Sequence, residues 1–187
     1  MAEQGAEWFR GTSSWVWGAL ALLAAAIVIV IDGVDGWDLA VIAAALLFAV
    51  LSYVAIIRPR VGVEAGDLVL HHMYSTQRLP VAAVETVAIG RTLEATAGGR
   101  HYVSAAVGRS LRASFKSNGP RDPQKNYADF VEDRILHLAD QARVEAGIRR
   151  ESEEQFALAE DVRRTWAWPW VAVTGVLVVL LVLGLVL

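Results

Sequence analysis

The sequence contains no cysteine. This absence excludes disulfide bonds, zinc sites built on thiolates and a cysteine nucleophile. Charged residues are also scarce, at 20% of the chain, whereas hydrophobic residues make up 55% and the mean hydropathy is +0.41. A typical soluble domain is less apolar than this. The organisation of the protein therefore depends on where the apolar residues gather along its 187 positions.

Three long segments carry no charged residue: 15–31, 39–57 and 165–187. Each is close to the roughly 20 apolar residues that cross about 30 Å of hydrocarbon. Glu3 and Glu7 outnumber Arg10 ahead of the first segment, which favours a retained anchor over a cleaved signal peptide. The predicted spans also lack histidine, and this argues against an ion path or proton relay. We expect anchors at residues 13–31, 39–57 and 166–187, with a tail over 1–12 and a loop over 32–38.

Arginine positions predict the orientation of these spans. One arginine precedes the first span, two follow the second and two precede the third, at positions 10, 58, 60, 163 and 164, while the 32–38 loop has no basic residue. Basic flanks favour the cytoplasmic side. We therefore predict a multi-pass protein of the plasma (inner) membrane with a cytoplasmic N-terminus, a cytoplasmic central domain and an extracytoplasmic C-terminus.

Six of the seven tryptophans lie at the ends of the predicted spans. An indole ring with one N–H donor favours the headgroup level of a bilayer. We therefore interpret them as membrane-interface anchors: Trp15, Trp17, Trp37, Trp166, Trp168 and Trp170.

The segment between the second and third spans has the composition of a soluble domain, with 16 basic and 15 acidic residues over 58–165. Its first part alternates short β-forming runs with turn signals, which predicts antiparallel strands with a hairpin at Gly98-Gly99. Pro80 favours a sheet edge or a single helical turn over 79–83. Further along, apolar residues recur at helical spacing from Tyr127 to Ala142, so we predict an amphipathic helix with Asn126 as N-cap and Gly147 as its stop. A helical connector over 148–165 is expected to lead into the third span.

Several segments of this domain match a known pattern: Arg58-Pro-Arg-Val61, Gly66-Asp-Leu-Val-Leu70, Arg78-Leu-Pro80, Val84-Glu-Thr-Val-Ala-Ile89 and Tyr127-Ala-Asp-Phe-Val-Glu-Asp-Arg134. Together they resemble the bacterial pleckstrin-homology-like (PH-like) domains of small actinobacterial membrane proteins. The resemblance covers about residues 58–147. It implies a membrane-anchored α+β protein whose PH-like part is an antiparallel β-barrel, or two bent sheets, capped by a C-terminal helix. It brings no catalytic motif.

The polar residues give no recognisable catalytic, cofactor or metal spacing. His71 and His72 are adjacent on a predicted strand and so point to opposite faces, and His101 and His137 lie on other elements. The sequence has no His-Glu-x-x-His and no Gly-x-Ser-x-Gly, and Gly98-Gly99 lacks the context of a phosphate loop. We therefore predict no enzyme activity, no catalytic residues, no cofactor and no metal site.

One basic stretch stands out, with seven bases and two acids over 91–125. Bases held near a membrane attract anionic lipids, each contributing on the order of 1 kcal/mol. A solvated, exposed loop explains the same charges equally simply. Nucleic acid is not expected, because aromatic residues are not interleaved with the bases. The candidate contacts for an anionic lipid or an acidic partner are Arg109, Arg112, Lys116, Arg121 and Lys125.

These features lead to three alternative functions. The first is a non-enzymatic scaffold or regulatory module that binds a membrane-associated protein. The second is an accessory subunit of a larger membrane complex, for example a respiratory supercomplex, because Ala24–Ala26, Ala43–Ala45 and Gly175 would permit close helix packing. The third is a sensor of anionic lipids. The expected partners are membrane lipids and a membrane protein or complex.

Overall fold

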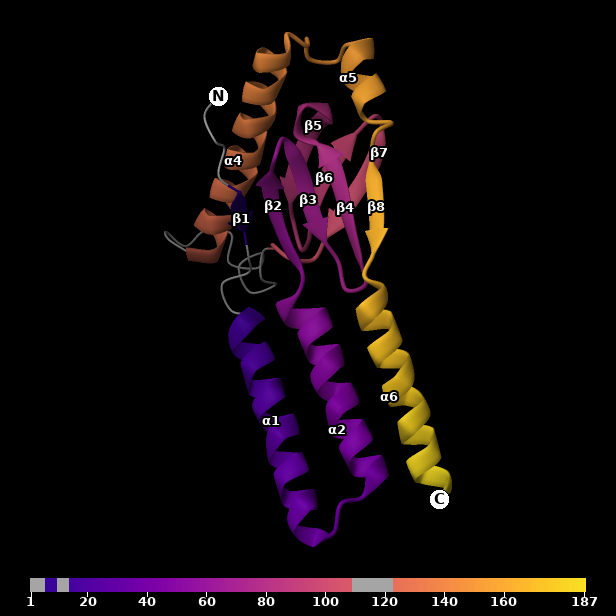
Figure 1. The fold of residues 1–187 in the computed structure, drawn as a ribbon. Helices are drawn as coiled ribbons and strands as arrows, with labels where there is room; N and C mark the ends of the chain where they lie inside the picture. Colours follow the sequence, from indigo (N-terminus) through magenta and orange to yellow (C-terminus); the bar gives the residue numbers. More distant parts are fainter. Residues whose placement is uncertain (1–5, 10–13, 109–122) are drawn as a thin grey trace. The chain divides into compact units, whose positions relative to one another are not determined.

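The computed structural model describes residues 6–9, 14–108 and 123–187 (Figure 1). The chain divides into two compact units. The first, which we call the sheet domain, comprises residues 1–12 and 59–165, and the second, the helix unit, comprises residues 13–58 and 166–187.

The described part of the sheet domain contains two antiparallel sheets. The larger has the strand order β1-β2-β3-β4-β8 and the smaller the order β5-β6-β7. The strands are β1 (Glu7–Phe9), β2 (Arg60–Glu64), β3 (Asp67–His71), β4 (Ser75–Pro80), β5 (Val84–Ile89), β6 (Leu93–Ala97), β7 (Arg100–Ser104) and β8 (Arg163–Trp166). The predicted α+β class is confirmed, and the strands form two separate sheets.

Tight turns connect the consecutive strands. Gly98 and Gly99, with φ of +57° and +69°, join β6 to β7 as the predicted hairpin, and Ala65-Gly66 joins β2 to β3 in the same left-handed region. Ala65 does this with a side chain, which the left-handed region disfavours. The residues after Pro80 form a short 3₁₀ helix, η2 (Val81–Ala83), in agreement with the predicted single helical turn.

Helix α4 (Pro123–Ala146) packs against η2 and β5. It begins three residues before the predicted N-cap, so the assignment of Asn126 as the cap was wrong; proline favours the first helical turn, where its missing N–H costs nothing. The helix ends at Gly147, whose φ of +70° confirms the predicted stop. Its most deeply buried residues are Ala128, Val131, Ile135 and Ala139, while Tyr127, Leu138 and Ala142 are only partly buried at the flanks of this face.

One continuous core joins the two sheets and α4. Its fully buried members include Leu68 and Leu70 from β3, Leu79 from β4, Leu93 from β6 and Ile135 from α4. Burying a leucine side chain contributes about 1.5–3 kcal/mol. This core therefore accounts for much of the stability of the sheet domain.

The segment after Gly147 differs from the helical connector predicted over 148–165. It contains only one short helix, α5 (Glu153–Leu158), capped by the Ser152 hydroxyl, which accepts from the Gln155 backbone N–H at 3.3 Å. Strand β8 follows and joins the edge of the larger sheet beside β4. The β-forming residues Thr165 and Trp166 explain this strand, because sheet edges accept such residues readily.

The helix unit consists of α1 (Ser14–Asp35), α2 (Leu39–Ser52) continued by the π-helix η1 (Tyr53–Ile57), and α6 (Trp168–Val186). Three segments are long and apolar enough to cross a membrane, namely Trp15–Val34, Leu39–Ile57 and Trp168–Val186. The first was expected to end at residue 31, but α1 continues to Asp35. The turn after α1 is held by Asp32, whose carboxylate accepts the backbone N–H of Asp38 at 3.0 Å.

Helix α2 lies between α1 and α6 and packs against both (Figure 1). Glycines allow the helices to approach closely. A Cβ on Gly18 would lie 2.4 Å from Ile57 Cγ1, and a Cβ on Gly184 would lie 2.6 Å from the backbone N of Ala40. At most 22% of the residues in any span are buried within the unit. Most of the apolar surface of these helices is thus left for lipid or for other helices.

Candidate functional site: a polar pocket beside strand β5

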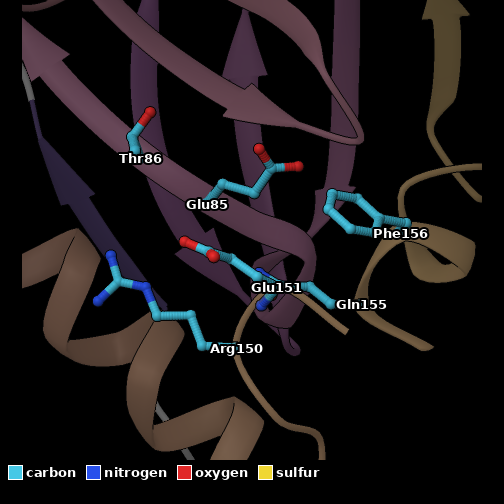
Figure 2. Close-up of a pocket in the computed structure, with 6 residues that line it drawn as sticks. All are labelled: Glu85, Thr86, Arg150, Glu151, Gln155 and Phe156. Atoms are coloured by element: carbon cyan, nitrogen blue, oxygen red, sulfur yellow. The ribbon is translucent and has the colours of Figure 1, made fainter. Parts of the chain in front are cut away.

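A pocket of about 400 Å³ opens beside the beginning of β5 (Figure 2). Its lining comes from two segments, the start of β5 and the stretch from the end of α4 into α5. The lining residues are Glu85, Thr86, Arg150, Glu151, Gln155 and Phe156.

A buried hydrogen-bond network reaches the pocket through Gln155. The backbone carbonyl of Val84 accepts from Arg143 Nη1 at 2.6 Å and from Gln155 Nε2 at 3.3 Å. Arg143 is only 3% exposed and also pairs with the Asp140 carboxylate, and Gln155 is fully buried. Buried polar groups that satisfy one another fix a unique local geometry. The network therefore ties β5, α4 and α5 together.

The backbone around the pocket is irregular at two points. The pairing of β5 with β6 shifts register between Val84 and Thr86, a β-bulge centred on Glu85. Glu151 adopts a φ of +59°, and its backbone N–H donates to Gln155 Oε1 at 2.8 Å. Bulges redirect side chains out of a regular sheet, and left-handed non-glycine residues are held only by their surroundings. Both irregularities position carboxylates at the pocket.

The pocket carries one net negative charge from its side chains. In Figure 2 the carboxylate of Glu151 points toward the side chain of Arg150, whereas the carboxylate of Glu85 points away from it. Glu85 Oε1 also accepts from the Gly99 backbone N–H at 3.3 Å, which holds its carboxylate in place. Phe156 is 43% exposed at the rim. Two carboxylates beside an exposed aromatic ring suit a cationic group, because charge-assisted hydrogen bonds and a cation–π contact are both available to it.

The histidines lie away from this pocket. His71 Nδ1 lies 2.8 Å from Thr76 Oγ1, and His101 Nδ1 lies 2.7 Å from Glu94 Oε1. Burial lowers the pKa of His72 and so favours its neutral imidazole. Over residues 6–9, 14–108 and 123–187, no three His, Cys, Asp or Glu side chains are grouped so that they could hold a metal ion.

The predicted basic contact site cannot be compared with the pocket. Arg109, Arg112, Lys116 and Arg121 lie outside the described residues, and Lys125 lies in the first turn of α4, where side chains are not described. The role of this group therefore stays a prediction.

The six tryptophans expected at the membrane interface lie near helix ends. Five of them are more than half exposed: Trp15 and Trp17 at the start of α1, Trp37 before α2, Trp166 at the end of β8 and Trp168 at the start of α6. The sixth, Trp170, is partly buried and stacks on Tyr53, with ring centroids 4.8 Å apart. Trp170 thus fastens α6 to the end of the second span.

The sequence predicted only a helical connector over 148–165, and it did not identify the pocket. Its residues are separated by up to 71 positions, and no spacing rule connects them. Gln155 lies beside Phe156 in the sequence, and this position was the one available signal for a buried polar residue near the pocket. No family model, curated protein or solved structure matches the chain.

Proposed function

We propose that this chain is a non-enzymatic, membrane-anchored binding module that recruits a protein partner through a basic side chain of that partner. The observation that carries the proposal is the pocket beside β5, which is lined by both Glu85 and Glu151 and whose Gln155 is held by hydrogen bonds to the backbone of Val84 and Glu151. A lysine or arginine side chain has the charge and the length to enter such a site, and its alkyl stem would lie against Phe156.

The PH-like resemblance supports a binding role for the sheet domain. Four strands in chain order in one sheet, three in the next and then the long helix α4 fit the implied arrangement of two sheets and a capping helix. We propose that the module lies at the inner face of the plasma membrane, as the flanking arginines suggest. The pairing of β1 with β2 supports one element of this topology, because it requires the tail before the first span and the domain after the second to share a compartment.

Purification from membranes in mild detergent, followed by quantitative mass spectrometry, tests the proposal. We expect one protein to co-purify with the wild-type chain. Its recovered amount should fall at least about tenfold with the Glu85→Gln/Glu151→Gln variant, since each charge-assisted bond contributes about 1.5–3 kcal/mol. Glu160→Gln is the matched control, because Glu160 is exposed and does not line the pocket. Unchanged recovery of every protein with the double variant would contradict the proposal.

A second candidate is the accessory subunit of a membrane complex, and a groove in the helix unit favours it. The groove, of about 350 Å³, lies between α1 and α2 and is lined by Ala24, Ala25, Val28, Val41, Ala44, Ala45 and Phe48. Small residues let helix backbones approach closely in a membrane. In this case membrane proteins would co-purify in fixed stoichiometry, and Ala44→Leu would release them while the pocket variant would not.

A further inference from the structure

The tail strand β1 lies along the outer edge of β2, ahead of the first span in sequence (Figure 1). The two strands pair antiparallel with Glu7 opposite Val63, Trp8 opposite Gly62 and Phe9 opposite Val61. Among the described residues of the tail, three make this pairing, and each of their side chains meets a matching feature of the sheet domain. The tail is therefore recognised by its side chains as well as by its backbone.

Gly62 makes room for the tail. A Cβ at this position would lie 2.5 Å from the backbone oxygen of Glu7 and 2.6 Å from Trp8 Cε3, closer than real Cβ contacts. Glycine in a strand interior weakens the strand and often marks the close approach of another backbone. At Gly62 the approaching backbone is that of β1.

Trp8 and Phe9 occupy opposite faces of the sheet. The guanidinium of Arg60 lies 4.4 Å from the Trp8 ring centroid, and the His71 ring lies 5.3 Å from it. Phe9 is 6% exposed and belongs to the core between the sheets and α4. At the edge of β2, the Arg60 guanidinium thus lies over the ring of Trp8, and the side chain of Phe9 is buried in the apolar core.

Glu7 is held by helix α4. Arg134 Nε donates to Glu7 Oε2 at 2.9 Å, and Arg134 Nη2 pairs with the other carboxylate oxygen, so the contact is bidentate. Bidentate arginine–carboxylate pairs add geometric specificity to their energy. An acidic residue in this register is therefore selected by charge.

We infer that the edge of β2, with Arg60, His71 and Arg134, is a strand-binding site for an extended segment of the pattern acidic–aromatic–aromatic. Residues 7–9 fill it as a tethered ligand, and a protein partner that carries such a segment binds by displacing them. Strand addition suits this role because main-chain hydrogen bonds supply affinity and alternate side-chain pockets supply specificity. Displacement is feasible because the Glu7 and Trp8 side chains of the occupant are only half-buried. This site is separate from the pocket beside β5 and does not depend on it.

Peptide binding to the full-length protein in detergent tests the inference. The probe is a fluorescent peptide of residues 5–11, Gly-Ala-Glu-Trp-Phe-Arg-Gly. In the Trp8→Ala protein the tail loses its contacts with Arg60 and His71 but keeps Phe9 in the core. We expect the probe to bind this variant at least about tenfold more tightly than the wild-type protein, because the intact tail competes as an intramolecular ligand.

Charge reversal tests whether the peptide binds at the proposed edge. Adding Arg134→Glu to the Trp8→Ala protein should weaken binding of the probe about tenfold. A probe with lysine in place of its glutamate should bind this double variant with the affinity restored. Arg149→Glu is the matched control, because Arg149 is an exposed arginine beyond the end of α4. A merely destabilised protein would lose both probes alike, so recovery separates recognition from folding.

Three results would overturn the inference. The first is equal binding of the probe to the wild-type and Trp8→Ala proteins, and the second is an absence of saturable binding to a Trp8→Ala protein that still unfolds cooperatively. The third uses the natural lack of cysteine. A disulfide between one copy carrying Glu7→Cys and another carrying Val63→Cys would show that the displacing strand comes from a second copy and not from a partner protein.

Discussion

Different interactions stabilise the sheet domain and the helix unit. In the sheet domain a closed apolar core is surrounded by side-chain bonds to the backbone, such as those from Arg143 and Gln155 to Val84. In the helix unit most apolar residues are exposed, and the helices meet where Gly18 and Gly184 allow contact. The lesson is that the same apolar residue type stabilises one unit by leaving water and serves the other as a surface for lipid.

Truncating a leucine or isoleucine should lower stability much more in the sheet domain than in the helix unit. Ile135→Ala in α4 should lower the free energy of unfolding by about 2–5 kcal/mol, because it leaves a cavity in a fully buried site. Leu23→Ala in α1 should change it little, because Leu23 is 57% exposed on a span. Chemical denaturation in detergent, monitored by tryptophan fluorescence, measures both. Similar losses from the two substitutions would remove the contrast.

Adding a side chain should break the helix unit only where helices touch. Gly184→Val should cost about 1–3 kcal/mol, because the new Cβ would lie 2.6 Å from the Ala40 backbone. Gly175→Val is the control, since open space surrounds Gly175 on the same helix. Thermal melting of the detergent-solubilised proteins should show a lower Tm for the first variant only. Equal Tm values would mean that α6 does not pack on α2 through Gly184.

Acidification should release the tail from the sheet domain. The hydrogen bond from Arg134 lowers the pKa of Glu7 below its ordinary value, partly opposed by burial. A depressed carboxyl pKa contributes stability above the unfolded value of about 4.3 and loses it as the pH falls through the folded value. We therefore expect wild type to exceed Glu7→Gln in unfolding midpoint at pH 7, and the difference to shrink once the pH falls below the unfolded value and to vanish below the lowered folded pKa of Glu7. Glu145→Gln, on the exposed surface of α4, is the control, and a pH-independent difference for Glu7→Gln would contradict the ion pair.

The smallest expected effect is a gain in stability at the β2–β3 turn. Ala65 holds a φ of +52° in the β2–β3 turn, so Ala65→Gly should relieve strain and raise the free energy of unfolding by up to about 1 kcal/mol. Greater freedom of glycine in the unfolded chain offsets part of this gain. Differential scanning calorimetry can detect the change, with Ala88→Gly, in the regular strand β5, expected to lose stability. A lower Tm for Ala65→Gly would mean that the turn does not store strain.

The local signals in the sequence predicted much of the fold. Uncharged runs located the three spans, Gly98-Gly99 located a hairpin and Gly147 ended the long helix, because each of these depends on neighbours in sequence. Asn126 misled, since an equally local signal, Pro123, lay one turn earlier. Strands β1 and β8 were missed because each is only a few residues long and exists by pairing with a strand that is distant in sequence.

The pocket could not be predicted for a related reason. Glu85 lines it because β5 bulges, and Glu151 lines it because Gln155 holds its backbone in the left-handed region. Hydrophobic periodicity predicts which faces of helices and strands are buried. It predicts neither the bulge at Glu85 nor the left-handed backbone of Glu151. Trp8 illustrates the same limit, because its surroundings come from Arg60 and His71, more than 50 positions away.

The pairing of β1 with β2 also constrains the order of events during synthesis. Residues 7–9 leave the ribosome first, but their partner strand and Arg134 follow only after two spans have been made. As membrane spans, α1 and α2 would have to insert with both ends of their hairpin on one side before β1 could reach β2. A chain whose first span inserts the wrong way cannot pair β1 with β2. The edge of β2, including Gly62, would then stay exposed to chaperones and proteases. The tail strand thereby makes correct membrane insertion a condition for a finished domain.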